Sequence, residues 1–497
     1  MTGTLLFYDF ETDGAEPQFC RPTQFACIRT DMDLNPVPGP EGEGLVLWCK
    51  PPVDRLPAPE AVLITGITPQ HADHEGTTER EFFGKIHALL NTPGTTSLGW
   101  NSIRFDDTVC RFGFWRNFHD PYTHGWSHGC RTWDLIDVAR ACYALRPKGI
   151  VWPAYAGEEW TEDRLAVAPA DGSPAFKLDM LAPANGIEHS DAHDALADVH
   201  ATVAFGKIMQ QANPKLWNLA LDMTDKRTVE KLLKSGRPLL HVSPKIPNAV
   251  GCASLVQVVA QHPINKREFI AWDLRHDPSE FIEADAETIR ARTFVSRDDL
   301  PEGIERFALK GIKSNRAPIV IAADKSLMDS IDTDRISLDL DACRRHWAQL
   351  EDAKDQIEKT VSAAWNREHT SRSDDADDLL YGGFMSDADK AVCDDVHVAD
   401  PDGLRTLDRR FNDPRLPDLL LHYRARNFPH SLDDAERTRW KARCAARLMD
   451  PPGRDDLSPD NWFEHAETLL ADPARTAEER HHLSEAIAWA THIRLDG

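Results

Sequence analysis

The first strand-like run of the chain, Leu5 to Thr12, constrains the fold more than any other stretch. It is apolar through Tyr8 and then places two carboxylates, Asp9 and Glu11, two residues apart. Because alternate side chains of a strand point to the same face, these carboxylates lie side by side at the end of a buried strand. Adjacent like charges need a cation, and carboxylate oxygens are ligands of hard divalent ions. The run indicates either a metal site or, as the plainer alternative, an ordinary acidic strand end.

The pattern that follows predicts an α/β layered domain. Strand-like runs at 24–30 and 45–50 are separated by a turn rich in proline and glycine, which predicts a three-strand meander with the first run. Periodicity then predicts helices and one short strand in alternation. The helices are expected at 79–90, 104–114 and 133–145, and the strand at 96–100. The segment 146–176, rich in proline, glycine and tryptophan, is expected to be an irregular insertion.

Three further side chains are candidates for the same site. Asp106 follows the end of the strand at 96–100, although an Asp in the first turn of a helix also has a plain structural explanation. His193 and Asp198 stand at the start of a helix that continues to about Met209. They converge if His193 lies in the loop or the first turn and Asp198 one turn further, with Ser190 and Asp191 as N-cap residues.

Composition limits the class of protein. The chain has 497 residues, 41% of them hydrophobic, which suffices for about three domains with real cores. No apolar run approaches the length of a membrane span, no secretory signal is recognisable, and the ten cysteines form no paired motif. These features predict a cytoplasmic protein with reduced thiols. The net charge of −24 argues against broad attraction to phosphate, so a nucleic acid would require locally concentrated basic residues.

Taken in chain order, the three acidic motifs resemble those of the DEDDh, or DnaQ-like, 3'-to-5' exonucleases. The motifs are Asp9-x-Glu11, Asn101 to Asp106, and His193 to Asp198. The resemblance implies that two Mg²⁺ ions, or Mn²⁺ in their place, are held by four carboxylates, with Glu11 also contacting substrate. It implies that His193 is the general base. The implied metal ligands are Asp9, Glu11, Asp106 and Asp198.

The resemblance extends beyond the acidic motifs to the bacterial exodeoxyribonuclease I family. Its sequence signatures include Arg21 to Ala26, Arg140 to Pro147, Gly383 to Asp389 and His422 to Pro429. The implied fold class is α/β, with a ribonuclease H-like exonuclease domain, an SH3-like middle domain and an all-helical C-terminal domain. The expected boundaries are 1–206, 207–352 and 356–497.

Residues that contact the DNA strand are also expected. In the exonuclease domain the family uses positions that mix guanidinium and aromatic groups, which pair with phosphates and stack on bases. They are Arg111, Tyr122, Trp126 and Arg140, although Trp and Tyr residues are also common in cores. Lys177 stands where the family has an arginine near the substrate. Lys310 and Asn315 belong to a local basic cluster with Lys313 and Arg316, for which a solvated loop is the alternative.

The sequence thus predicts a single-strand-specific DNA 3'-to-5' exonuclease that releases 5'-mononucleotides and acts in DNA repair. Two alternatives stay open: an RNA 3'-end exonuclease of the same superfamily, because the metal site does not distinguish the sugars, and an inert single-strand-binding protein. The family also implies docking of the C-terminal tail of single-strand DNA-binding protein. A monomer without membrane contact is expected.

Overall fold

The computed structural model describes residues 3–39, 41–155, 172–189, 194–295, 299–367 and 372–496, and these form two compact units. The first unit holds residues 1–131, 189–203 and 370–497, and the second holds 132–188 and 204–369. Ser190, Asp191 and His193, together with most of the expected insertion at 146–176, lie outside the described residues. Among the described residues, no helix is both long and apolar enough to cross a membrane.

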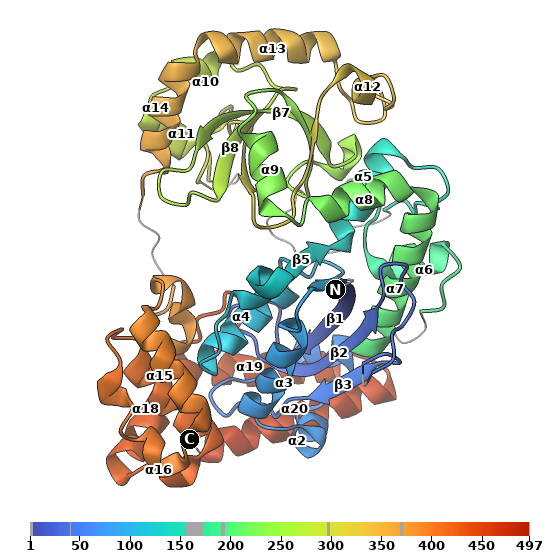
Figure 1. Cartoon of the computed structure of the whole chain (residues 1–497). Helices are drawn as coiled ribbons and strands as arrows, with labels where there is room; N and C mark the ends of the chain where they lie inside the picture. The colour runs from blue at the N-terminus through green and yellow to red at the C-terminus, as the bar shows by residue number, and fades with distance from the viewer. Residues whose placement is uncertain are drawn as a thin grey trace. The chain divides into compact units, whose positions relative to one another are not determined.

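A mixed five-stranded sheet has the strand order β3-β2-β1-β4-β5, and its first four strands organise the first unit (Figure 1). β1 pairs antiparallel with β2 and parallel with β4, and β2 pairs antiparallel with β3. The predicted three-strand meander is therefore confirmed. The strands are β1 (Thr4–Thr12), β2 (Pro22–Thr30), β3 (Leu45–Trp48), β4 (Thr95–Gly99) and β5 (Arg131–Asp134).

Helices from the N-terminal third of the chain cover this sheet. Aromatic residues of β1 and β2 pack against α3 and α4 in one core, which includes Phe10, Phe25, Phe82, Phe83 and Phe114. Such burial stabilises each large apolar side chain by about 1.5–3 kcal/mol. The helices are α1 (Pro59–Thr65), α2 (Pro69–Glu75), α3 (Glu79–Leu90), α4 (Asp106–Arg116), the short η1 (Thr123–Gly125) and η2 (Ser127–Gly129), and the start of α7 (Ala195–Ala212).

The C-terminal part of the first unit is helical, as predicted. A second core joins Phe112, Trp115 and Phe118 of the exonuclease-like part to Leu419 and Tyr423 of α17. α20 packs against α1, α2 and α19. The helices are η4 (Ala376–Gly382), α15 (Asp387–Val398), α16 (Pro401–Leu404), η5 (Asp408–Arg410), α17 (Leu416–Asn427), η6 (Pro429–Ser431), α18 (Asp434–Met449), α19 (Pro459–Ala471) and α20 (Ala477–Asp496).

The second unit is built on an antiparallel sheet with the order β10-β6-β7-β8-β9. Its strands are β6 (Leu239–Val242), β7 (Ala253–Gln261), β8 (Glu268–Asp273), β9 (Leu309–Lys313) and β10 (Ile319–Ala322). Its helices are α5 (Leu135–Leu145), α6 (Leu178–Ala184), α8 (Pro214–Asp222), α9 (Lys226–Leu233), η3 (Asn248–Val250), α10 (Ser279–Glu283), α11 (Ala286–Ala291), α12 (Lys325–Met328), α13 (Leu340–Asp352) and α14 (Lys354–Trp365).

Two helices begin later than expected: α4 begins at Asp106 and not at 104. Helix α5 begins at Leu135 and not at 133, because Asp134 keeps an extended backbone and caps the helix by accepting a hydrogen bond from the Ile136 N–H at 3.3 Å. The solvated loop left open for the basic cluster holds only in part, because Lys310 and Lys313 lie on strand β9, whereas Asn315 and Arg316 lie in the turn that follows. Antiparallel pairing of β9 with β8 buries Ile312 and leaves Lys313 exposed, so the lysines of β9 reflect the two faces of an edge strand.

Candidate active site

Three carboxylates of the first unit meet at the sheet. Asp9 and Glu11 leave the same face of β1, and Asp198 projects from the first turn of α7. One carboxylate oxygen from each lies within 4.8 Å of the other two. Asp9 is half-buried, and Glu11 is buried. The structure therefore brings together three of the four carboxylates that the sequence predicted as metal ligands.

The fourth carboxylate, Asp106, lies next to this group but is anchored differently. It is buried in the first turn of α4, and its Oδ1 accepts a hydrogen bond from the Phe10 N–H at 3.1 Å. The close approach of β4 to β1 also depends on Gly99, where a Cβ would lie 2.5 Å from the Tyr8 carbonyl oxygen. The backbone of β1 thus positions Asp106 directly beside Asp9.

Two residues that were not predicted as site residues position Asp198. Gln24 of β2 accepts a hydrogen bond from the Ala195 N–H at 3.0 Å and donates one to Asp194 at 3.3 Å, so it holds the first turn of α7 against the sheet. The Nε2 of His189 forms a short hydrogen bond to the Oδ1 of Asp198. The Gln in the Arg21 to Ala26 signature was the sequence signal for the first of these contacts. His193, the predicted base, lies outside the described residues.

The electrostatics of the group favour a bound cation. Burial, followed by the neighbouring charges of Asp106, Glu11 and Asp198, raises the pKa of the Asp9 carboxyl well above its usual range. Excess negative charge is therefore concentrated at this carboxylate. A set of carboxylate oxygens at close range matches the preference of Mg²⁺ and Mn²⁺, so these side chains fit a divalent metal ion.

An aromatic surface lies in the same unit. Two of its residues, Phe384 and Tyr381, were not predicted to contact a DNA strand. The Arg111 guanidinium pairs with Asp107 at 2.8 Å and lies 5.5 Å from the ring centre of Tyr122. The Tyr122 ring is 6.1 Å from that of Phe384. Phe384 is 89% exposed, more than any other large apolar side chain recorded for the described residues, and Trp126 is 61% exposed. The second missed residue, Tyr381, packs its ring 5.5 Å from that of Phe112.

The other four residues predicted to contact substrate or DNA belong to the second unit. Arg140 is buried, pairs with Asp137 at 2.8 Å and lies over the ring of Phe176. Lys177 is half-buried at the N-cap of α6. The Nζ of Lys310 donates to the carbonyl oxygen of Lys245 at 2.8 Å. Asn315 is exposed in the turn between β9 and β10.

Three family models match successive parts of the chain. The model described as "Exonuclease" covers residues 6–205, the "Exonuclease I SH3-like domain" covers 224–367, and the "Exonuclease I C-terminal domain" covers 374–493. Together they confirm the predicted fold class: an exonuclease domain, an SH3-like domain and a helical C-terminal domain.

Curated relatives and solved structures agree with these matches. The chain is 42% identical to exodeoxyribonuclease I of Escherichia coli over 88% of both chains. It is 38% identical to the Haemophilus influenzae enzyme over 88% of this chain and 89% of that one. Exonuclease I from Methylocaldum szegediense aligns over 99% of both chains with a TM-score of 0.87 and 39% identity.

The E. coli enzyme in complex with a dA16 oligonucleotide aligns with a TM-score of 0.89 and 38% identity, over 99% of this chain and 100% of that one. Another solved structure is a zinc-ion-bound form of the E. coli complex with single-stranded DNA, with a TM-score of 0.88 and 37% identity over 99% of this chain and all of the other. The similarity extends through every region of the chain, and the protein belongs to the exonuclease I family.

Proposed function

We propose that this protein hydrolyses single-stranded DNA from the 3' end, releases 5'-mononucleotides and serves DNA repair. The observation that carries the proposal is the approach of Asp9, Glu11 and Asp198, whose oxygens lie within 4.8 Å of one another beside Asp106. The relatives named exodeoxyribonuclease I, and the solved complexes of one of them with DNA oligonucleotides, support the choice of substrate.

Two Mg²⁺ ions, with Mn²⁺ as an alternative, are the proposed cofactors, held by Asp9, Glu11, Asp106 and Asp198. Bound divalent ions polarise the phosphoryl oxygens, lower the pKa of water and stabilise charge on the leaving oxygen. Asp9 would be the central ligand of this set, because burial and then the charges of neighbouring carboxylates raise its pKa. Glu11 is additionally assigned to the terminal nucleotide, together with Lys177.

The histidines of the segment have separate proposed roles. His193 takes the proton of the attacking water, since a histidine near its ordinary pKa of about 6.5 accepts a proton at neutral pH. His189 orients the Asp198 carboxylate through the hydrogen bond between them. Gln24 fixes the helix start that carries Asp198. In this proposal the base His193 and the metal ligand Asp198 are five residues apart in the sequence.

The DNA strand is proposed to cross the aromatic surface of Tyr122, Trp126, Tyr381 and Phe384. Exposed aromatic rings stack on bases of any identity, and the Arg111 guanidinium, held by Asp107 beside the Tyr122 ring, adds positive charge near this surface. This arrangement provides binding without sequence readout, which suits an exonuclease that removes every nucleotide in turn. Arg140, Lys310 and Asn315 remain proposed contacts of the strand.

The experiment that tests the function is a digestion of matched oligonucleotides. Single- and double-stranded DNA and single-stranded RNA, each labelled at the 3' or the 5' end, are incubated with Mg²⁺ and then with chelator. The proposal expects mononucleotides from the 3' end of single-stranded DNA only while the metal is present. Faster degradation of RNA would favour the RNA exonuclease, and binding without hydrolysis would favour the inert binding protein.

The aromatic surface has its own test. Phe384→Ala is expected to weaken binding of a fluorescent oligothymidylate in chelator by about 1–3 kcal/mol, the usual contribution of one stacked base. Val398→Ala is the matched control, because Val398 is 82% exposed at the end of α15 and its side chain has no aromatic ring that could stack on a base. Equal affinities of the two variants would remove Phe384 from the path of the strand.

Three further features of the protein belong to this proposal. The domain division at 1–206, 207–352 and 356–497 is proposed as the functional organisation of the chain. The C-terminal tail of single-strand DNA-binding protein is the proposed protein partner, and the proposed state is a cytoplasmic monomer. Size-exclusion chromatography with light scattering, with and without a peptide of that tail, measures the mass and the association.

A further inference from the structure

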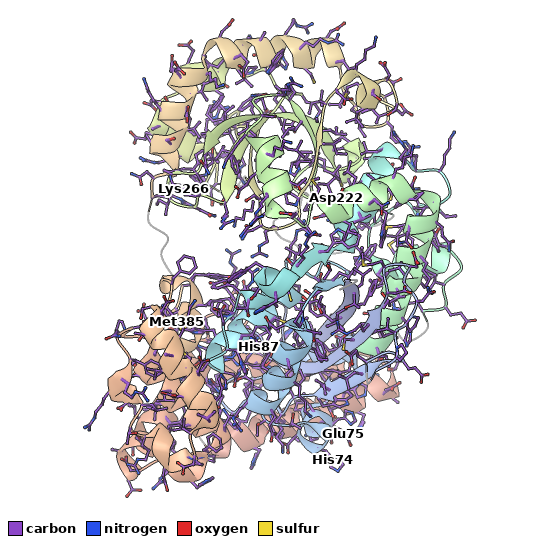
Figure 2. All side chains as sticks on the ribbon, in the orientation of Figure 1. His74, Glu75, His87, Asp222, Lys266 and Met385 are labelled. Carbon is purple, nitrogen blue, oxygen red and sulfur yellow. The ribbon has the colours of Figure 1, made fainter. Side chains whose placement is uncertain are left out.

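Three histidine rings form a continuous stack inside the first unit. The rings of His87 and His119 are 4.4 Å apart at 16°, and those of His119 and His397 are 4.2 Å apart at 18°. His87 lies on α3 and His119 follows α4, whereas His397 is near the end of α15. Figure 2 labels His87 on α3 and Met385 at the approach to α15. The stack therefore connects the exonuclease domain to the C-terminal domain.

The surroundings of the stack favour neutral histidine rings over protonated ones. All three rings are half-buried, and the edge of His87 faces the Phe114 ring at 5.0 Å. The Nε2 of His87 is buried without a hydrogen-bond partner. The Nε2 of His397 lies 3.2 Å from the carbonyl oxygen of Phe118. A proton added to His87 would have no acceptor at that atom, so the neutral rings suit the closed arrangement.

Charged groups on the neighbouring elements shift the pKa values of these rings, some upward and some downward. Arg80 of α3 disfavours protonation of His119 and His397, and buried His124 of η1 disfavours that of His87. Asp120 favours protonation of His87, and Asp394 favours that of His397. His124 itself is bound to Asp107 at 2.7 Å, and Asp120 pairs with Lys390 of α15 at 3.4 Å. Burial is the largest cause for each ring; it helps lower the pKa of His87 to about 4 and of His119 to about 2.

We propose that His87, His119 and His397 form an acid-sensitive latch that holds α15 against the exonuclease domain at neutral pH and releases it in weak acid. Two stacked rings that both carry protons would place like charges about 4 Å apart, which opposes the closed arrangement. When α15 separates, His397 and the face of His119 that it covered become exposed, and the pKa values of these two rings rise toward the ordinary histidine value of about 6.5. The separated form then binds more protons, so acid favours opening.

The direction of the effect follows from the two pKa values of each ring. The closed arrangement is fully stable above about pH 6.5 and loses stability as the pH falls below that value. Each ring that gains a proton only on opening favours the open form about tenfold more at pH 5.5 than at pH 7.5. Two such rings favour it about a hundredfold more.

The latch also bears on the proposed DNA path, and this consequence rests on the proposed function. Tyr381 and Phe384 precede α15, and Ser386 caps that helix by accepting from the Asp389 N–H at 3.1 Å. Movement of α15 therefore displaces the exposed ring of Phe384 from that of Tyr122. Opening of the latch is expected to weaken the binding of single-stranded DNA without any change at the carboxylates.

Thiol labelling tests the latch without DNA or catalysis. Cys393 of α15 is 4% exposed in the core shared with the exonuclease domain, and Cys27 is fully buried in the β1-β2 sheet. The full chain is labelled with 4,4'-dithiodipyridine, which reacts with thiols in acid, and mass spectrometry reports each site. The rate at Cys393 relative to Cys27 is expected to rise more than about tenfold between pH 7.5 and pH 5.5.

The matched variant is His119→Phe combined with His397→Phe, which keeps aromatic rings in the stack but removes two protonation sites. Its relative labelling rate is expected to change less than about threefold over the same pH range. An equal rise in variant and wild type, or no rise in the wild type, would overturn the latch. The wild-type measurement decides alone if the variant does not fold, which rapid labelling of Cys27 at pH 7.5 would reveal.

A second readout separates the latch from the proposed function. Binding of a fluorescent oligothymidylate in chelator is expected to weaken on acidification for the wild type and to persist for the variant. If labelling follows the expectation but neither protein binds DNA at pH 7.5, the latch stands and the proposed DNA path fails. If binding weakens equally in both proteins, the latch does not control the aromatic surface.

Discussion

Two acidic clusters of the first unit have nearly the same geometry and opposite electrostatics. Asp9, Glu11 and Asp198 form one, and Asp375, Asp377 and His422 form the other; in each, three potential metal-ligand atoms lie within 4.8 Å of one another. A cavity of about 170 Å³ even lies beside the second cluster. Geometry alone would therefore assign a metal site to both.

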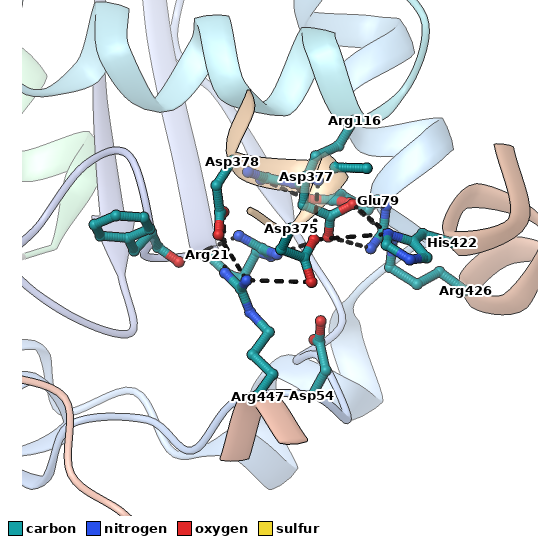
Figure 3. Close-up of polar contacts among 12 residues, drawn as sticks. Arg21, Asp54, Glu79, Arg116, Asp375, Asp377, Asp378, His422, Arg426 and Arg447 are labelled. Carbon is teal, nitrogen blue, oxygen red and sulfur yellow. Dashed lines mark hydrogen bonds and ion pairs between the residues drawn. The ribbon is translucent and has the colours of Figure 1, made fainter. Parts of the chain in front are cut away.

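The charges around the second cluster exclude that assignment. Asp377 is fully buried and accepts from Arg426 at 2.7 Å, Arg443 at 3.0 Å and Arg21 at 3.2 Å. Figure 3 shows the network that continues through Asp378, whose carboxylate pairs with Arg447 at 2.7 Å. A divalent ion here would have to approach several guanidinium groups that already compensate the carboxylates.

The pKa values show the same contrast. Burial would raise the pKa of Asp377, but the guanidinium groups of Arg426 and Arg443 and the ring of His422 hold it well below its usual range. The pKa of Asp9 is raised by its burial and then by the charges of the neighbouring carboxylates. The protein itself neutralises the second cluster, which joins two domains, whereas the first cluster fits a cation from solution.

The largest effect is expected from Asp9→Asn. This substitution removes a charged metal ligand at the centre of the site, and the release of mononucleotides from single-stranded DNA in Mg²⁺ should fall at least about a thousandfold. End-labelled oligonucleotides and gel analysis measure it. In chelator the variant should be at least as stable as the wild type, since repulsion among the carboxylates is relieved. Activity within tenfold of wild type would contradict the assignment.

The same chemical change in the other cluster should affect folding instead. Asp377→Asn leaves buried guanidinium groups without their carboxylate, and breaking a buried pair in this way costs about 3–5 kcal/mol of unfolding free energy. Urea denaturation followed by tryptophan fluorescence measures the loss. A variant as stable as Asp9→Asn would show that the arginines do not distinguish the two clusters.

Local sequence patterns predicted the elements that carry the first cluster. The apolar run of β1, its alternation at Asp9 and Glu11, and the acidic start of α4 are all visible within short windows. The second cluster could not be found in this way, because Arg21 and Asp377 are brought together over 356 residues. Its function depends on which arginines surround it, and this is a property of the packed domains.

Polar strands and long-range positioning contacts were also difficult to predict. Strand β9 has the sequence LKGIK, whose two lysines suggested a solvated cluster, while pairing with β8 is what buries Ile312. Phe384 was read only as part of a family signature, because its exposure depends on the fold around Tyr122.

Metal binding should stabilise the protein through the first cluster only. A ligand at a hundred times its Kd stabilises the native state by about 2.7 kcal/mol, so saturating Mg²⁺ should raise the Tm of the wild type by several degrees. Differential scanning fluorimetry against Mg²⁺ concentration measures the shift. Asp9→Asn should abolish most of it, and Asp377→Asn should retain it on a lower starting Tm. Loss of the shift in Asp377→Asn alone would reverse the assignment of the two clusters.

The smallest effect concerns the pH dependence of stability in chelator. The pKa of Asp9 is higher in the folded state than in the unfolded state, so the folded protein binds a proton at Asp9 more readily. The cost of Asp9 to the stability of the folded protein is therefore smallest in acid. The stability advantage of Asp9→Asn over wild type should therefore be greatest at high pH and shrink, by about 1 kcal/mol, as the pH falls through that raised pKa.

Comparing the two proteins at each pH cancels contributions that they share, including those of the histidine stack. Asp377→Asn should show the opposite relation, because the pKa of Asp377 is lowered in the folded state. Its deficit relative to wild type should be constant near neutrality and shrink only below the unfolded value of about 3.9. Urea titrations at a series of pH values measure both differences. If the differences from wild type changed with pH in the same way for both variants, the carboxylates of the first cluster would not be coupled. Their mutual repulsion would then not support the binding of a cation.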